Sequence, residues 1–357
     1  MIDAKILVVI LKDEYGDPRR GESYEYNYFF RTLQRMYAEC RLFDYGPFLR
    51  RTSALQSNLL RTAQEFMPDL IFFTLYEDQF EPETLDRLKE HHLTINWFCD
   101  DQWRFETFSS RYCHHFSHVV TTDPYAVKKY REAGYSQAIL SQWATRDCVP
   151  QFADAGVDYL HDVSFVGAMN PFRRWLVGEL GKRAVSVTCF GHGWPTGRVT
   201  YERMEEIIRG SRINLNISNS RSYDIRYVLS SFSRLRTFRS SPKTKEQIKG
   251  RHFEINALGG FQLTNYVEFL EDYFWLGKEI AIYNALDDLV DKIRYYLDHD
   301  DLRCSIARAG YERVRREHTY ERRFANIFAR IGLAPAGRDL TGIREGPTLE
   351  SFGEKDS

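Results

Sequence analysis

The chain has 357 residues, a formal net charge of −1 and 43% hydrophobic residues. This length exceeds the size at which a single hydrophobic core stops growing, so we expect two domains. The balanced charge argues against a general binder of nucleic acid or membrane surfaces, and the hydrophobic content excludes a largely disordered chain.

The first half of the chain alternates strand-like and helix-like segments. Strands are expected at residues 6–11, 70–75, 94–99 and 118–122, where short apolar runs occur. Helices are expected at residues 28–37, with Ser23 as a cap, and at 82–91 and 124–133. Strands that alternate with helices predict a parallel, doubly wound sheet.

The same pattern starts again in the second half, with strand-like runs at 163–166, 185–190 and 213–217. We therefore expect an N-terminal Rossmann-like domain over residues 1–154 and a C-terminal one over 155–317. Residues 334–357 are rich in glycine, proline and charge, and we expect this tail to be disordered.

Six cysteines are scattered without a C-x-x-C pair or the spacing of a zinc site; they are Cys40, Cys99, Cys113, Cys148, Cys189 and Cys304. This usage predicts reduced thiols in a cytoplasmic protein. The apolar run 6–11 has only the length of a strand, and charged residues follow it. It predicts neither a signal peptide nor a membrane span.

The segment 246–260 reads EQIKGRHFEINALGG and carries the most informative pattern. Two carboxylates, Glu246 and Glu254, flank Lys249 and Arg251. Carboxylates accept hydrogen bonds from sugar hydroxyls, cations neutralise phosphates, and glycines let backbone N–H groups approach an anion. The pattern therefore favours a site for a sugar, a ribose and a diphosphate. The alternative is a solvated charged loop before a helix.

Several segments in register resemble one known family. They are KGRHFEINALGGFQLT (249–264), FWLGKEIAIY (274–283), RYYL (294–297), IARAGY (306–311), HTYERRF (318–324), DVSFVG (162–167), GHGWP (191–195), INLNIS (213–218), NWFCDDQWRF (96–105) and VVTTD (119–123). Together they resemble the spore maturation protein CgeB-like glycosyltransferases.

The resemblance implies a GT-B fold, in which two Rossmann-like doubly wound domains face each other across a cleft. It implies an enzyme that transfers a sugar from a nucleoside diphosphate sugar, most plausibly a UDP-sugar, with retention and without a metal. The first domain would take the acceptor and the second the donor, and a helix within 318–333 would cross back to the first domain.

The resemblance assigns Glu254 to the ribose hydroxyls and Glu246 to the donor sugar. Because a diphosphate gains negative charge as it leaves, Lys249 and Arg251 are the best candidates to stabilise it. Their alternative role is solvated surface charge.

Further candidates lie outside this pair. Arg173 and Arg174, in N-P-F-R-R after a predicted strand, are the next basic candidates, although each could simply pair with its neighbours. The N–H groups of Gly259 and Gly260 could meet the phosphates or sugar, or the two glycines could form a tight turn before a strand.

His192 and Trp194, in F-G-H-G-W-P, could wall the nucleotide site or only pack a loop. Asp100 and Asp101 follow a predicted strand, and one of them could orient the acceptor or receive its proton. Adjacent aspartates lack the D-x-D spacing of a metal site, and helix capping is their alternative. His318 is expected to anchor the last helix.

A basic insertion at 221–245 departs from the family pattern. It holds Arg221, Arg226, Arg234, Arg236, Arg239, Lys243 and Lys245 against one acid, Asp224. Such a patch could face an anionic acceptor, including nucleic acid, but a solvated helix and loop is the alternative. The acceptor itself stays open between glycan, protein and nucleic acid.

Two other functions are compatible with the sequence. A catalytically silent nucleotide-sugar-binding protein would share the fold, because fold does not guarantee activity. An oxidoreductase with two Rossmann domains is disfavoured, because no G-x-G-x-x-G follows the first predicted strand.

Overall fold

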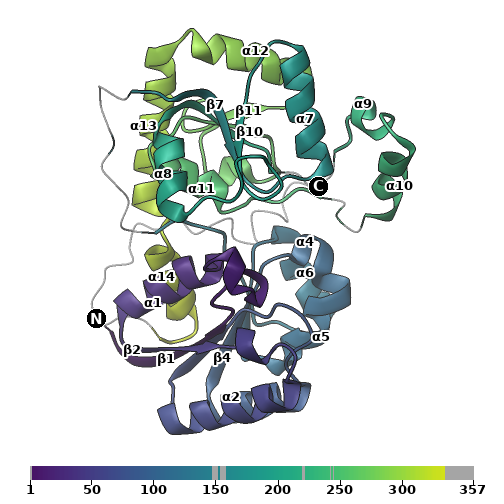
Figure 1. Cartoon of the computed structure of the whole chain (residues 1–357). Helices are drawn as coiled ribbons and strands as arrows, with labels where there is room; N and C mark the ends of the chain where they lie inside the picture. Colours follow the sequence, from purple (N-terminus) through teal and green to yellow (C-terminus); the bar gives the residue numbers. More distant parts are fainter. Residues whose placement is uncertain are drawn as a thin grey trace, which may run out of the picture. The chain divides into compact units, whose positions relative to one another are not determined.

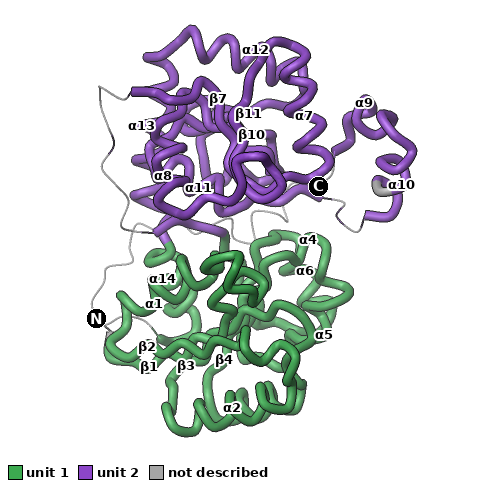
Figure 2. Tube along the Cα trace, viewed as in Figure 1, with its two compact units in different colours: residues 1–142, 320–346 green, residues 143–319, 347–357 purple. Residues whose placement is uncertain are grey.

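The computed structural model describes residues 2–146, 152, 158–218, 222–241, 243 and 245–333. Within them the chain forms two compact units (Figure 2). The first unit takes residues up to Gln142 and then the helix that starts at Tyr320, and the second takes Trp143–Thr319. The expected boundary at residue 154 and the expected disordered tail fall on residues outside the described ones, so both stay predictions.

The first unit is built on a six-stranded sheet in the order β2-β1-β3-β4-β5-β6, and every pairing is parallel. Its strands are β1 (Ile2–Ile10), β2 (Tyr37–Asp44), β3 (Leu70–Phe73), β4 (Leu93–Phe98), β5 (His118–Thr121) and β6 (Ala138–Leu140). β3 is buried at all four positions, as expected for a strand covered on both faces.

Helices surround this sheet (Figure 1). They are α1 (Arg31–Met36), α2 (Thr52–Phe66), α3 (Pro82–His91), α4 (Asp101–Arg104), α5 (Ser110–Tyr112), α6 (Pro124–Glu132) and α14 (Tyr320–Arg330). Tighter or wider helical turns occupy Glu14–Gly16, Pro18–Arg20, Tyr26–Phe30, Gly46–Phe48, Phe105–Ser109 and Cys113–His115. The Ser23 cap is confirmed, because its Oγ accepts a hydrogen bond of 3.0 Å from the Tyr26 N–H.

Helix α14 completes the core of the first unit although it comes from the end of the described chain. Tyr320, Phe324 and Phe328 are fully buried in it. The Phe324 ring lies 5.7 Å from Phe29 and 5.5 Å from Phe72, edge to face in both cases.

The second unit is built on a five-stranded sheet in the order β11-β10-β9-β7-β8, again parallel throughout. Its strands are β7 (His161–Val166), β8 (Thr188–Phe190), β9 (Ser211–Asn216), β10 (Gln262–Asn265) and β11 (Ala281–Tyr283). Its helices are α7 (Pro171–Lys182), α8 (Tyr201–Arg209), α9 (Ile225–Val228), α10 (Phe232–Ser240), α11 (Arg251–Ala257), α12 (Leu286–Leu297) and α13 (Asp300–Glu317), with a short turn at Leu270–Asp272.

The strands expected from sequence are present, and each ends within three residues of its expected position. The pattern missed β2, β6 and β11. The fold class is confirmed: both units are parallel α/β sheets of Rossmann type.

Candidate functional site

The carboxyl ends of the strands in the second unit gather the strongest candidates. In parallel α/β sheets ligands bind beyond these ends, where loops are free to vary. The first of them follows β7, where the buried Phe165 ring and the glycine Gly167 form a small platform. The guanidinium carbons of Arg173 and Arg251 lie 5.2 Å and 5.7 Å from the centre of that ring.

Arg173 is held in place by the start of α7. The Oδ1 of Asn170 caps the helix by accepting a 2.8 Å hydrogen bond from the Arg173 N–H, and Pro171 occupies the first turn. The side chain then donates to the carbonyl of Ile217 at 2.9 and 2.6 Å and to that of Ala168 at 2.8 Å. These bonds fix its orientation at the ends of β7 and β9.

Arg251 is the first residue of α11, a helix whose other six residues are all buried. A methyl group placed on Gly167 would lie 2.9 Å from Arg251 Nη1, so the glycine is needed for this guanidinium to approach the strand end. Burial first, and the neighbouring Arg251 charge second, lower the pKa of Arg173 to about 9. The guanidinium keeps its proton at neutral pH, so the shift marks two cations held close together.

Glu246 lies at the ends of the neighbouring strands. Its Oε2 accepts a hydrogen bond from Asn265 Nδ2, and Asn265 Oδ1 accepts 2.9 Å bonds from the N–H and the Oγ of Ser218. Burial, and then Glu246, raise the pKa of Tyr283 at the end of β11, whereas Arg173 opposes the rise. The structure therefore brings Glu246, Arg173 and Arg251 together at the carboxyl end of the sheet.

Lys249 and Glu254 belong to the same segment. Lys249 is half-buried, and its N–H donates a 3.0 Å hydrogen bond to Nδ1 of the fully buried His252. Glu254 is also buried and lies one helical turn after Arg251, so the two share a face of α11.

Trp194 and His192 occupy the loop after β8. The Trp194 indole Nε1 donates a 2.9 Å hydrogen bond to the Gly167 carbonyl, which places its ring beside the platform. The His192 side chain is exposed, and its carbonyl accepts a 2.8 Å bond from the Met169 N–H. Trp194 therefore lines the edge of the site, and His192 contributes its backbone to the loop.

Three of the sequence candidates lie elsewhere in the second unit. Arg174 is exposed and lines a separate groove between α7 and Arg234. Gly259 and Gly260 precede β10, so they lie at the amino end of the sheet. A methyl group on Gly260 would come within 2.7 Å of both Asn214 and Ile208. These two glycines form the tight turn that was their alternative interpretation.

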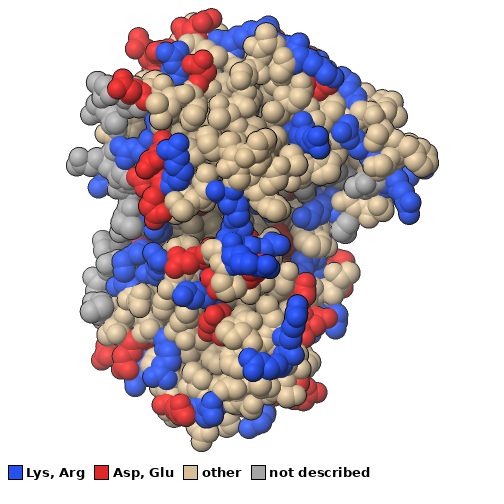
Figure 3. Space-filling view, viewed as in Figure 1, with Lys and Arg blue, Asp and Glu red and all other residues tan. Residues whose placement is uncertain are grey.

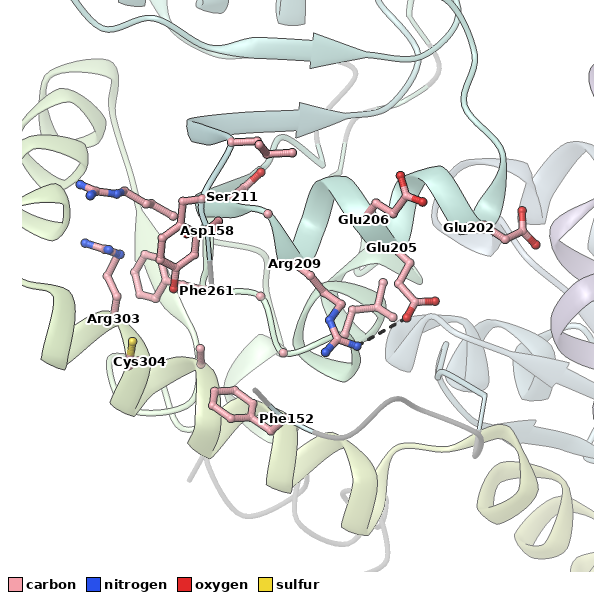
Figure 4. A pocket seen from close by; sticks show the side chains of 18 residues that line it. Phe152, Asp158, Glu202, Glu205, Glu206, Arg209, Ser211, Phe261, Arg303 and Cys304 are labelled. Carbon is pink, nitrogen blue, oxygen red and sulfur yellow. Dashed lines mark ion pairs between the residues drawn. The ribbon is translucent and has the colours of Figure 1, made fainter. Parts of the chain in front are cut away.

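A pocket of about 630 Å³ lies at this amino end of the sheet (Figure 4). Gly259 and Gly260 line it together with Arg209, Arg303 and Cys304. Arg209 is paired there with Glu205 at 3.6 Å. The pocket is therefore separate from the platform at the strand carboxyl ends.

In the first unit, Asp100 and Asp101 follow β4 and point to different surroundings. Asp101 is fully buried, and its Oδ2 accepts a 3.0 Å hydrogen bond from the Tyr130 hydroxyl. Burial raises the pKa of Asp101 to about 6. Asp100 is half-buried, and its charge acts on Glu25, whose pKa rises to about 7 through burial first and then through Glu14 and Asp100.

Sequence reasoning missed Glu25, Asn265 and Tyr283. Glu25 sits in a helical turn with no motif, and nothing in the sequence marks the burial that raises its pKa. Asn265 and Tyr283 each end a strand, and a polar residue at that position is the signal that points to them. The Nε2 of His318 lies 2.8 Å from the Tyr273 carbonyl in the second unit, and its expected role in anchoring the last helix stays a prediction.

In the part of the chain that the structure describes, no group of three or more His, Cys, Asp and Glu side chains is arranged to hold a metal ion. No described helix is long and apolar enough to cross a membrane.

The fold is that of the GT-B glycosyltransferases, as solved structures show. Sucrose-phosphate synthase from Thermosynechococcus elongatus is similar with a TM-score of 0.60 and 10% identity, over 92% of this chain and 97% of that one. HepE from Anabaena, in a complex with UDP and glucose, has a TM-score of 0.57 and 11% identity, over 92% and 98%.

A third similar structure is a putative UDP-N-acetylglucosamine 2-epimerase from Listeria monocytogenes, with a TM-score of 0.52 and 10% identity, over 92% and 97%. The fold therefore carries more than one activity. Residues 173–329 match the family model described as "Glycosyl transferase-like", which supports a glycosyltransferase-like second unit. No curated protein matches the chain.

Proposed function

We propose that the protein is a glycosyltransferase that moves a sugar from a nucleoside diphosphate sugar, with UDP as the nucleotide, to an acceptor. The family match supports this, because it begins at Arg173 and includes the whole segment from Glu246 to Glu254. The neighbour with UDP and glucose bound supports the choice of donor. A CgeB-like specificity is part of the same proposal, on the segments that resemble that family.

The observation that carries the proposal is the pair of guanidinium groups over Phe165. Two cations held near one ring make this site strongly positive, and a diphosphate carries two adjacent negative groups that suit it. Guanidinium forks match phosphate oxygens in geometry. Because they are fixed before the reaction, Arg173 and Arg251 stabilise the charge that grows on the leaving diphosphate, and no metal ion is needed.

In this reaction the bond between the sugar C1 and the β-phosphate oxygen breaks, and its electron pair leaves with the nucleoside diphosphate. An acceptor oxygen forms the new bond to C1 and loses its proton. We assign Glu254 to the ribose hydroxyls, Glu246 with Asn265 to the sugar hydroxyls, Lys249 to the phosphates and Trp194 to the wall beside them. Retention at C1 is part of the proposal, by resemblance to families with this carboxylate pair.

The first unit would supply the acceptor side. Burial raises the pKa of Glu25 to about 7, and the charges of Glu14 and then Asp100 add to the rise. We assign to Asp100 and Glu25 the orientation of an acceptor hydroxyl and the uptake of its proton. We also propose a cytoplasmic location, since no disulfide joins the described cysteines Cys40, Cys99, Cys113, Cys189 and Cys304.

The test is a panel of nucleotide sugars, measured for slow hydrolysis and for a rise in melting temperature. We expect a UDP-sugar to be hydrolysed. The free sugar released first should have the same anomeric configuration as the sugar in the donor. Stabilisation without turnover for every donor, with a range of acceptors present, would instead identify a silent binding protein. No stabilisation by any nucleotide would overturn the proposal.

Glu254→Gln tests the ribose assignment with little change in side-chain volume. Losing a charged acceptor of diol hydrogen bonds should weaken UDP affinity by roughly 10- to 100-fold, which corresponds to about 1.5–3 kcal/mol. Calorimetry with free UDP measures it. Affinity equal to that of the wild-type protein, in a variant with an unchanged melting temperature, would remove Glu254 from the nucleotide site.

A further inference from the structure

The segment from Ser222 to Ser241, which carries α9 and α10, is a surface feature that the proposed reaction does not use. In the chain it follows β9 and precedes Glu246, so it begins at the carboxyl end of the sheet, where Arg173 lies. Figure 2 shows it to one side of the second unit. We call it the α9–α10 segment.

One aromatic residue anchors this segment to the core. Tyr227 is buried, and its ring lies 5.2 Å from Phe172 and 5.4 Å from Trp175, both on α7. The guanidinium carbon of Arg234 lies 5.2 Å from the centre of the Tyr227 ring. The segment is therefore packed against α7 through Tyr227.

Around that anchor the segment exposes large apolar side chains to solvent. The exposed fractions are 62% for Tyr223, 68% for Ile225, 66% for Leu229 and 85% for Phe232. Single exposed apolar residues are ordinary, but four of them within one short segment mark a surface that binds something.

The same segment is strongly basic. From Ser222 to Ser241 it has four arginines against one acid, and Lys243 and Lys245 follow. The single acid, Asp224, is paired with Arg226, whose Nη2 lies 2.8 Å from Asp224 Oδ2 and whose Nη1 lies 3.0 Å from Asp287 Oδ2. The positive charge of the segment therefore comes from its other arginines, of which Arg236 and Arg239 are exposed. Basic side chains lie on this part of the surface in Figure 3. Such a surface favours an anionic partner.

We infer that the α9–α10 segment binds the surface of an anionic lipid bilayer. Exposed leucine, isoleucine and phenylalanine beside arginines are the combination that enters the boundary between lipid headgroups and acyl chains. A nucleic acid could stack its bases on Tyr223 and Phe232, but it offers nothing apolar to cover the exposed aliphatic side chains of Ile225 and Leu229, whereas acyl chains cover all four. The inference does not depend on the identity of the sugar donor.

The experiment is sedimentation of the full chain with vesicles of phosphatidylcholine, with and without phosphatidylglycerol. Binding is expected only when phosphatidylglycerol is present, and it should weaken as salt rises. The double variant Leu229→Ser/Phe232→Ser should bind roughly tenfold more weakly, because it removes the inserted apolar groups. The charge reversal Arg236→Glu/Arg239→Glu should lose at least about as much.

Matched controls separate this surface from general stickiness. Trp275→Ser removes an exposed aromatic residue elsewhere in the second unit, and Arg87→Glu reverses an exposed charge on α3. Both should bind vesicles as the wild-type protein does. All four variants should keep their affinity for UDP, so a failure here is distinguishable from a failure of the proposed reaction.

Two results would overturn the inference. In the first, the wild-type protein does not bind vesicles, or it binds them equally well with and without phosphatidylglycerol. The other is tight binding of a single-stranded oligonucleotide that depends on Arg236 and Arg239 but not on Leu229 and Phe232, which would assign the segment to nucleic acid.

Discussion

Arg173 and Arg174 are neighbours in the chain, yet the helix separates their functions. The first turn of α7 directs Arg173 to the carbonyl of Ile217, whereas Arg174 lies exposed on a different side of the helix. Adjacent helical residues do not face the same way. This gives an experiment a control one position away from the residue it tests.

We predict that Arg251→Ala lowers kcat by about 10²–10³ and changes KM less, because the lost donor acts on charge that develops in the transition state. Arg251→Lys should also be poor, since an ammonium cannot reproduce a fork that contacts two oxygens. Arg174→Ala should behave as the wild-type enzyme. Steady-state kinetics beside a melting curve measures each variant. A well-folded Arg251→Ala variant with wild-type kcat would remove Arg251 from the mechanism.

His252 gives the second unit a sensitivity to acid. Its Nδ1 accepts from the Lys249 N–H, and burial first, with the charges of Arg251 and Lys249 opposing protonation, lowers its pKa to about 3. The unfolded chain binds the proton with a pKa of about 6.5. Between these values the unfolded state binds more protons, so the free energy of unfolding falls as pH drops, by up to about 5 kcal/mol in total.

We therefore expect His252→Gln to be less stable at pH 7 but to lose less of its remaining stability between pH 6.5 and 4. Melting temperatures across that range measure the slope. His91→Gln, at an exposed position on α3, is the control and should leave the slope unchanged. Equal slopes for His252→Gln and the wild-type protein would show that His252 does not cause the acid sensitivity.

At the scale of elements, the glycines Gly259 and Gly260 between α11 and β10 show that one sequence pattern can predict either an anion site or a turn. The sequence favoured backbone N–H groups for an anion and a tight turn about equally. Gly259 has a φ of +77°, and Gly260 lies against Asn214 and Ile208 at the start of β10. The turn joins a buried helix to a buried strand, and this requires the close contact.

Gly260→Ala should accordingly destabilise the protein by about 1–3 kcal/mol through overpacking, and UDP affinity should not change. Gly178→Ala on α7 is the matched control, because a methyl group there meets nothing within 4 Å. A helical Gly→Ala change of that kind stabilises by roughly 0.5–1 kcal/mol. Denaturant unfolding and calorimetry measure the two quantities. Weaker UDP binding by a folded Gly260→Ala variant would return the glycines to the donor site.

The expected elements were those with a clear pattern. Helix α3 begins at Pro82 and has leucines at helical spacing, and β3 is an unbroken apolar run. Strand β2 was missed because it follows α1 directly, so no turn residue marks its start, and because its residues do not alternate strictly between polar and apolar. β11 has only three residues, too few for any periodicity.

For the whole molecule, the sequence could predict the fold but only part of the site. Alternating elements are local signals, so two parallel sheets follow from them. The meeting of Arg173 with Arg251 depends on how the first turns of α7 and α11 come together at the end of β7, and no local pattern carries that information. The raised pKa of Glu25 was hidden for the same reason, because burial in the folded unit causes it.

Because protein cations meet the diphosphate in the proposed reaction, turnover of the whole enzyme should persist in excess EDTA. Rates measured with and without the chelator, and after adding magnesium or manganese, check this expectation. Loss of turnover in EDTA that magnesium restores would mean that a metal ion shares the charge of the leaving group, and the arginine pair would then have a smaller role.

The placement of α14 has a consequence for how the chain folds as it is made. The six strands of the first unit leave the ribosome early, but the helix that covers Phe29 and Phe72 emerges only after all of the second unit. Until then those rings stay uncovered, so the second unit can finish folding first although it is synthesised later. A stop codon before Tyr320 would therefore leave the second unit able to fold, although that unit lies next to the truncation. It would destabilise the first unit, whose other residues come much earlier in the chain.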